Sequence, residues 1–341
     1  MEYFRQRFID ELNDEGPVIV RGFDWPSADV LKQMSPNDYE THFTDWTVIQ
    51  KQASMERARE FLQENGCLER FNRLHTQLEK QSVIPFVGAG LSKSTGFPMW
   101  GAFLAGLTSD YATISADVGH RLSAYRYEEA ADLLISRLGT NVFSEGVQNT
   151  FGSQTKPIKG PVQLLPLLFK RGCITTNFDY VLDRVYDFSD CRLKDKFIGA
   201  RLKEAPRRLA DDPHCLLRIH GEADSENGRV LTSVEYDACY GAAGSYRELM
   251  KILIANSSLL FMGCSLSVDR TITALREIKQ QAVVETPRHF AFLPLNDDVN
   301  REARRTELAL ADIHPIWYPP ENPDQAIEDL LLALLEGGFH D

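Results

Sequence analysis

A glycine-rich turn follows a short apolar run and has the residue types that can hold a phosphate. Residues 83–87 (VIPFV) predict a buried strand, and the turn after it contains Gly88, Ala89, Gly90 and Ser92. Glycines at such a turn let backbone N–H groups approach a pyrophosphate near a helix N-terminus. The third glycine of G-x-G-x-x-G is absent, since Lys93 occupies its place. Two interpretations therefore stay open, a dinucleotide-binding turn or an ordinary strand-to-helix turn. No GxxxxGK[ST] segment occurs, which excludes a P-loop ATPase by sequence.

Polar side chains follow two further apolar runs. Asn177 and Asp179 come directly after residues 172–175, and His220 comes after residues 215–219. A histidine at a strand end can act as a general base, because its ordinary pKa lies near neutrality. The alternatives are structural: an asparagine and an aspartate suit a helix start, and a lone histidine is often a core residue.

Two more strand ends carry small polar residues. Gly263, Ser265 and Ser267 follow the apolar residues 258–262, and Asn296 follows residues 289–293. In a parallel sheet, all these strand ends meet at one carboxyl edge, where ligands bind. The joint pattern predicts one ligand site built from five loops.

The elements that must position these residues alternate along the chain. Helical patterns are expected at 100–111, 127–138, 178–186, 246–255, 268–281 and 325–335, and a further strand at 313–318. Short apolar strands alternating with helices predict an α/β fold, a Rossmann-like parallel sheet covered by helices on both faces. Residues 55–80 predict a helix broken at Gly66, while residues 16–46 show no clear period. We divide the chain into a mainly helical N-terminal cap or assembly arm, 1–80, and a ligand-binding domain, 81–341.

Charge and cysteine content restrict the class of protein. The 341 residues include 37 basic and 49 acidic ones, for a net charge of −12. This balance argues against coating nucleic acid by charge, so no direct nucleic acid binding is expected. The sequence has no secretory signal and no apolar run of membrane-spanning length, and its six scattered cysteines have no zinc spacing. We expect a cytoplasmic protein that holds no metal.

The order of the motifs VGAGLS, GFPMW, TTNFD, IHG and GCSLSVD resembles the sirtuin-like NAD-binding family, over about residues 82–335. It looks most like the bacterial subgroup found in antiphage defence. The resemblance implies that Asn177 and His220 are catalytic. It implies that NAD, the substrate, is bound by Gly88, Ala89, Gly90, Ser92, Pro98, Trp100, Asp179, Gly263, Ser265, Leu266 and Asn296.

Three departures from the sirtuin deacylases redirect the expected activity. The two CxxC pairs of their zinc module are absent, Gly96-Phe97-Pro98-Met99-Trp100 replaces their loop, and Thr176 replaces the usual glutamine. Because the zinc module helps to form the acyl-lysine cleft, the expected reaction is hydrolysis of NAD to nicotinamide and ADP-ribose. The resemblance implies gated NAD depletion in abortive infection, a homo-oligomer, and a ring-shaped DNA-translocating ATPase as partner. A non-catalytic NAD or ADP-ribose sensor or scaffold is the main alternative; a deacylase and a nuclease are weaker ones.

Overall fold

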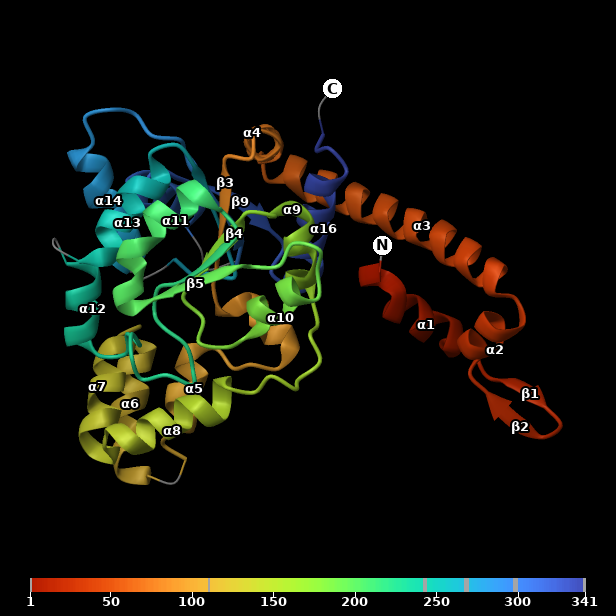
Figure 1. The fold of residues 1–341 in the computed structure, drawn as a ribbon, viewed down its shortest axis with the longest axis horizontal. Coiled ribbons are helices and arrows are strands. Elements are labelled where there is room, and N and C mark those ends of the chain that lie inside the picture. The colour runs from red at the N-terminus through yellow and green to blue at the C-terminus, as the bar shows by residue number, and fades with distance from the viewer. Residues whose placement is uncertain (1, 110, 242–243, 267–269, 297–299, 340–341) are drawn as a thin grey trace.

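A seven-stranded parallel sheet forms the centre of the computed structural model, which describes residues 2–109, 111–241, 244–266, 270–296 and 300–339 (Figure 1). The strands are β3 Val83–Val87, β4 Gly172–Thr175, β5 Asp195–Ile198, β6 Cys215–Arg218, β7 Ser258–Met262, β8 His289–Pro294 and β9 Ile313–Tyr318. The predicted α/β fold is thus confirmed, and the six predicted strands are present with ends that differ by one residue at most. Their near-continuous burial is typical of parallel strands covered on both faces.

The strand order is β5-β6-β4-β3-β7-β8-β9. The chain places β4, β5 and β6 on one side of β3, with β5 at the edge and β6 between β5 and β4, and then places β7, β8 and β9 on the other side. The topological switch point therefore lies between β3 and β7, and open α/β sheets bind ligands in the crevice outside such a point. The predicted glycine turns follow these two strands.

The edge strand β5 was not predicted. Its sequence, Asp-Lys-Phe-Ile, buries only Phe197 completely, because it pairs with β6 on one side alone. A four-residue edge strand with two charged residues has no apolar run to reveal it.

Helices cover the sheet. After the N-terminal 3₁₀ turn η1 (Glu2–Phe4) they are α1 Arg5–Asp14, α2 Ser27–Met34, α3 Pro36–Glu64, α4 Leu68–Glu79, α5 Trp100–Gly106, α6 Ala112–Ser123, α7 Tyr127–Leu138, α8 Thr140–Phe151, α9 Leu165–Leu168, α10 Val181–Asp187, α11 Ala205–Asp211, α12 Ser233–Tyr240, α13 Ser245–Ile254, α14 Arg270–Gln281, α15 Arg301–Ala309 and α16 Pro323–Leu335. Helices α4 and α16 contact strands of the sheet on one side, and α11, α13 and α14 pack together on the other (Figure 1).

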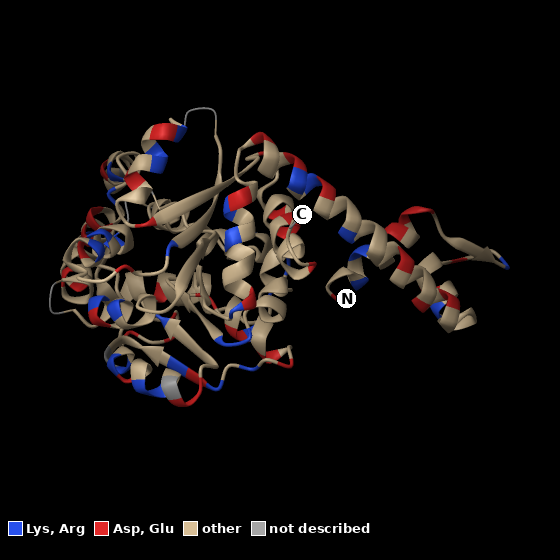
Figure 2. Ribbon diagram, turned by 90° about the horizontal axis from the view of Figure 1, so that it is seen from above, with Lys and Arg blue, Asp and Glu red and all other residues tan. Residues whose placement is uncertain are grey.

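The N-terminal region is mainly helical, as predicted. The long α3 packs on α16, where the Arg57 guanidinium pairs with the buried Asp329 carboxylate through two hydrogen bonds of 2.9 and 2.8 Å. The predicted break at Gly66 is confirmed by its φ of +56°. Two strands missed by prediction, β1 Val18–Val20 and β2 Phe23–Trp25, form an exposed hairpin that extends away from the sheet (Figure 1). Figure 2 shows acidic and basic residues interspersed along this arm.

Helices α5–α8 form a separate layer, at the bottom of Figure 1. Ion pairs and hydrogen bonds connect it to the segments that follow β6 and β7: Arg270 pairs with Glu128, Ser233 N–H donates to Asp132, and Arg229 donates to Ser144. This layer therefore docks on the loops at the carboxyl edge of the sheet. Within the described part of the chain, no helix combines the length and apolar character needed to cross a membrane.

Candidate active site at the carboxyl edge

One hydrogen bond joins the loops that follow β3 and β4. The Asn177 Nδ2 donates to Ser92 Oγ at 3.1 Å, across 85 positions of sequence. Thr175 strengthens the same junction, because its hydroxyl donates to the Val87 carbonyl at 2.8 Å and accepts from the Asn177 N–H at 3.0 Å. The structure thus brings together Ser92 and Asn177, two residues that the sequence analysis placed in one site.

The Asn177 amide is buried but only half satisfied. Asn177 as a whole is only 6% exposed. Its Oδ1 atom has no hydrogen-bond partner among the described residues. Buried polar atoms are normally paired, because leaving one unpaired costs about 1–3 kcal/mol. An unpaired carbonyl oxygen at the end of a central strand is a ready acceptor for a ligand hydroxyl or a water molecule.

Asp179 shares Ser92 with Asn177. The Ser92 hydroxyl, which accepts from Asn177, also hydrogen-bonds to the Asp179 carboxylate, and Asp179 Oδ1 accepts from the Val181 N–H at 3.0 Å. Burial raises the pKa of the Asp179 carboxyl above its ordinary value, and these two hydrogen bonds oppose that shift. Asp179, which precedes the N-cap residue Tyr180, thus contacts the first residue of α10, whereas the Asn177 side chain is directed toward Ser92.

A fully buried arginine, missed by the sequence analysis, fixes this loop. Arg218 ends β6 and donates to the backbone carbonyls of Asn177 and Asp179 at 2.9 and 2.8 Å. Its charge is balanced by an ion pair with the buried Asp183. The signal in the sequence is an arginine that interrupts an otherwise apolar strand, CLLR. Asp183 also pairs with Lys196, so it is removal of Asp183 that would leave the Arg218 charge buried without a partner.

His220 is paired with a tyrosine that the sequence analysis also missed. Its Nε2 lies 2.6 Å from the Tyr240 hydroxyl of α12, and its ring meets the Tyr236 ring edge-on at 5.1 Å between centroids. Burial lowers the pKa of His220 to about 3, so the imidazole is neutral at physiological pH. A neutral imidazole can accept a proton, and the tyrosine fixes its orientation.

The loops that carry Asn177 and His220 run side by side. The Ile219 N–H donates to the Thr175 carbonyl at 3.0 Å, and the Ala223 N–H donates to the Phe178 carbonyl at 3.1 Å. These bonds continue the β4–β6 pairing beyond the strands. The two predicted catalytic residues therefore project from adjacent backbone segments at one edge of the sheet.

The glycine turns after β3 and β7 pack directly on each other. The N–H groups of Gly88 and Gly90 donate to the carbonyls of Met262 and Gly263, each at 2.9 Å. A Cβ atom at Gly90 would lie 2.7 Å from Gly263 Cα, and Gly263 itself has a φ of +67°. Close backbone approach at the switch point thus requires these glycines. Ala89 and Ser92 lie in the 3₁₀ helix η2, Ala89–Thr95, instead of a regular α-helix. The role of this turn toward a pyrophosphate stays a prediction.

An aromatic cluster borders the Asn177 loop. Trp100, at the start of α5, stacks on Phe103 at 5.1 Å and lies 5.3 Å from the Phe178 ring. Pro98 and Trp100 are each half-buried, just before and at the start of the docked helical layer. The predicted cover over a nicotinamide ribose would come from this layer.

The remaining predicted contacts lie on the other side of β3. Ser265 and Leu266 follow β7, where the Arg304 guanidinium binds both of their carbonyls, and Leu266 has a φ of +51°. Asn296 is exposed beyond the end of β8. Ser267 lies outside the described residues. Among the residues described, no cluster of three or more His, Cys, Asp or Glu side chains could hold a metal ion.

Residues 171–316 match the family model of the SIR2-like domain. The matched segment runs from β4 through most of β9, and it contains Asn177, Asp179, His220, Gly263 and Asn296. The β3 turn with Gly88, Gly90 and Ser92 lies before it. The family binds NAD and includes NAD-dependent enzymes. No curated protein matches the chain.

Proposed function

We propose that the protein hydrolyses the nicotinamide–ribose bond of NAD, giving nicotinamide and ADP-ribose. The observation that carries the proposal is the buried Asn177 amide, held by Ser92 with its carbonyl oxygen unpaired, on the loop beside His220. The match of residues 171–316 to the SIR2-like domain supports NAD as the ligand. NAD enters here as the substrate.

Cleavage of the nicotinamide–ribose bond needs no general acid. The nicotinamide nitrogen is already cationic, so the C–N bond breaks to release a neutral leaving group without prior protonation. A water oxygen then bonds to the ribose carbon, and one proton leaves. Fixed dipoles aimed at the charge that develops on the ribose are usually the largest contribution. Asn177 Oδ1 accepts a hydrogen bond from a ribose hydroxyl or from the attacking water in this scheme.

In this scheme, His220 accepts the proton that leaves the attacking water. Its imidazole is neutral, because burial lowers its pKa to about 3, and Tyr240 fixes its ring at 2.6 Å. General base assistance typically supplies about 10²–10⁴-fold in rate. A pKa this low makes His220 a weak base in the free protein, so its orientation by Tyr240 matters more than its intrinsic basicity.

Biological control extends the same proposal. An unrestrained NADase would deplete the NAD of its own cell, so we infer that assembly or a partner gates the activity, in the context of antiphage defence. The N-terminal residues 1–80, with their protruding hairpin, are the assembly surface in this scheme, and a ring-shaped DNA-translocating ATPase is the proposed partner.

The test measures free nicotinamide after the full-length protein is incubated with NAD, with and without an ATPase encoded beside it. Wild type is expected to release nicotinamide, and Asn177→Ala and His220→Ala to lose that activity while remaining folded by circular dichroism. Undiminished NAD consumption in both variants would overturn the proposal. Binding of NAD without turnover under every condition would establish the non-catalytic sensor instead.

A further inference from the structure

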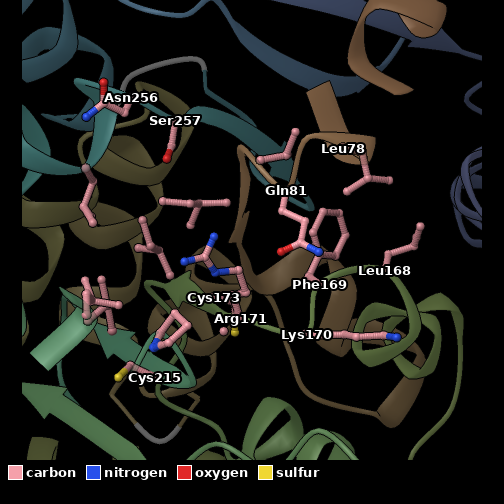
Figure 3. Close-up of a pocket in the computed structure, with 18 of the residues that line it drawn as sticks. Leu78, Gln81, Leu168, Phe169, Lys170, Arg171, Cys173, Cys215, Asn256 and Ser257 are labelled. Carbon is pink, nitrogen blue, oxygen red and sulfur yellow. The ribbon is translucent and has the colours of Figure 1, made fainter. Parts of the chain in front are cut away.

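A cavity lies at the amino edge of the sheet, opposite the edge that carries Asn177 and His220. It has a volume of about 580 Å³ and is lined by the first residues of the central strands, Val83 of β3, Gly172 of β4 and Cys215 of β6. The C-terminal ends of α4 and α13 close it from the sides (Figure 3). Small-molecule sites in proteins typically have volumes of about 300–1,000 Å³. This cavity is therefore large enough for a small organic ligand.

The cavity walls are mainly apolar. Leu78 and Leu253 come from the two closing helices, Phe169 precedes β4, and Leu209 and Leu217 complete the wall near β6. Apolar surface in an open cavity is in contact with water, and a ligand with a hydrocarbon body would remove that contact.

A single guanidinium group lies among these apolar walls. Figure 3 shows the Arg171 side chain extending into the cavity, and the side chain of Lys170, which also lines the cavity, extending in a different direction. Arg171 makes no hydrogen bond or ion pair with any described residue. An arginine without a partner beside apolar surface is suited to bind a carboxylate through two parallel hydrogen bonds.

The surrounding charges limit the ligand to one negative charge. The charged side chains that line the cavity are Arg171, Lys170 and Glu79, two cations and one carboxylate, and the C-terminal ends of α4 and α13 add partial negative charge. The net positive charge of these side chains is about one, which one carboxylate would balance, whereas several phosphates would exceed it. The Gln81 amide and the Ser257 hydroxyl, both beside the cavity, add neutral hydrogen-bonding capacity (Figure 3).

We propose that this amino-edge cavity binds a small amphipathic monoanion, with its hydrocarbon body against the apolar wall and its carboxylate on Arg171. The site is separate from the proposed NAD site, because four-residue strands, roughly 13 Å long, lie between the two edges. It also lies at the starts of β4 and β6, the strands whose other ends carry Asn177 and His220.

The experiment titrates the full-length protein with sodium octanoate by isothermal titration calorimetry. Saturable one-to-one binding is expected, and affinity should rise about fourfold for each methylene along the series butyrate, hexanoate, octanoate. Neutral 1-octanol should bind about tenfold more weakly, since it lacks the charge that Arg171 pairs with.

Two matched variants decide the role of the guanidinium. Arg171→Met should weaken octanoate binding by about tenfold or more, and Lys80→Met, which removes the same charge at a residue that does not line the cavity, should change it less than twofold. Both side chains are exposed, so both variants should fold. Absence of octanoate binding, an affinity independent of chain length, or equal effects of the two variants would each overturn the proposal. None of these readouts depends on NAD cleavage, so the two proposals fail separately.

Discussion

Asn177→Ala is expected to remove nicotinamide release while leaving the free energy of unfolding nearly unchanged. The substitution deletes one hydrogen bond, from Nδ2 to Ser92 Oγ at 3.1 Å, which contributes about 0.5–1.5 kcal/mol to stability. It also deletes the buried Oδ1 atom, whose missing partner costs the native state about 1–3 kcal/mol. The two effects oppose each other, so we expect a net change within about 1.5 kcal/mol.

The effect on activity should be much larger. A dipole that interacts with the reacting centre typically contributes about 10²–10³-fold to turnover, equivalent to about 2.7–4 kcal/mol. The unpaired oxygen of Asn177 has this role in the proposed reaction. The prediction is therefore a loss of at least about 10²-fold in nicotinamide release.

Asn72 provides the matched control. Both polar atoms of its side chain are hydrogen-bonded to the backbone of Phe339. Nδ2 donates to the Phe339 carbonyl at 2.8 Å, and Oδ1 accepts from the Phe339 N–H at 3.1 Å. Asn72→Ala should therefore lower stability by about 1–3 kcal/mol and leave turnover intact. The assays are urea unfolding and chromatographic measurement of nicotinamide. The reasoning is refuted if Asn177→Ala destabilises the protein more than Asn72→Ala does and keeps its activity.

Three further predictions concern Tyr240, Gly90 and two histidines. Tyr240→Phe removes the 2.6 Å contact with His220 and should lower kcat for nicotinamide release about tenfold, with little change in KM. Steady-state kinetics measure both constants, and an equally large change in KM would indicate that Tyr240 contacts the substrate instead. Gly90→Ala should lower the free energy of unfolding by about 1–3 kcal/mol, because its Cβ would lie 2.7 Å from the Cα of Gly263 in the turn after β7. Gly106→Ala, which has open space around it, should not destabilise the protein. Similar urea midpoints for the two variants would contradict this prediction. Burial lowers the pKa of His220 to about 3 and of His289 to about 4, so below pH 6.5 the unfolded chain binds protons that the folded chain does not. The free energy of unfolding should therefore fall by up to about 1.4 kcal/mol per pH unit for each histidine. Urea unfolding curves between pH 7 and 4.5 test this, and a free energy of unfolding that does not change over that range would exclude it.

Local sequence was enough to predict six of the seven strands of the sheet. Residues 83–87 and 258–262 are short, fully apolar and followed by glycine, and both form central strands at the predicted positions. Apolar runs between helical patterns also predicted the helical cover on both faces, because burial on two sides leaves a direct trace in residue type. The polar edge strand Asp195–Ile198 and the exposed hairpin Val18–Trp25 leave no such trace, since neither depends on a continuous apolar face.

The sequence by itself determined which residue types stand at the strand ends, and therefore that a polar edge exists with Asn177 and His220 on it. Only the tertiary structure decided their partners: Ser92 for Asn177, Tyr240 for His220, and Arg218 beneath the loop. The physical reason is the separation along the chain of the residues that interact. Strand formation follows from the apolar character of neighbouring residues, whereas these contacts join residues 20 to 85 positions apart, and they arise only when strand order and register place the loops side by side.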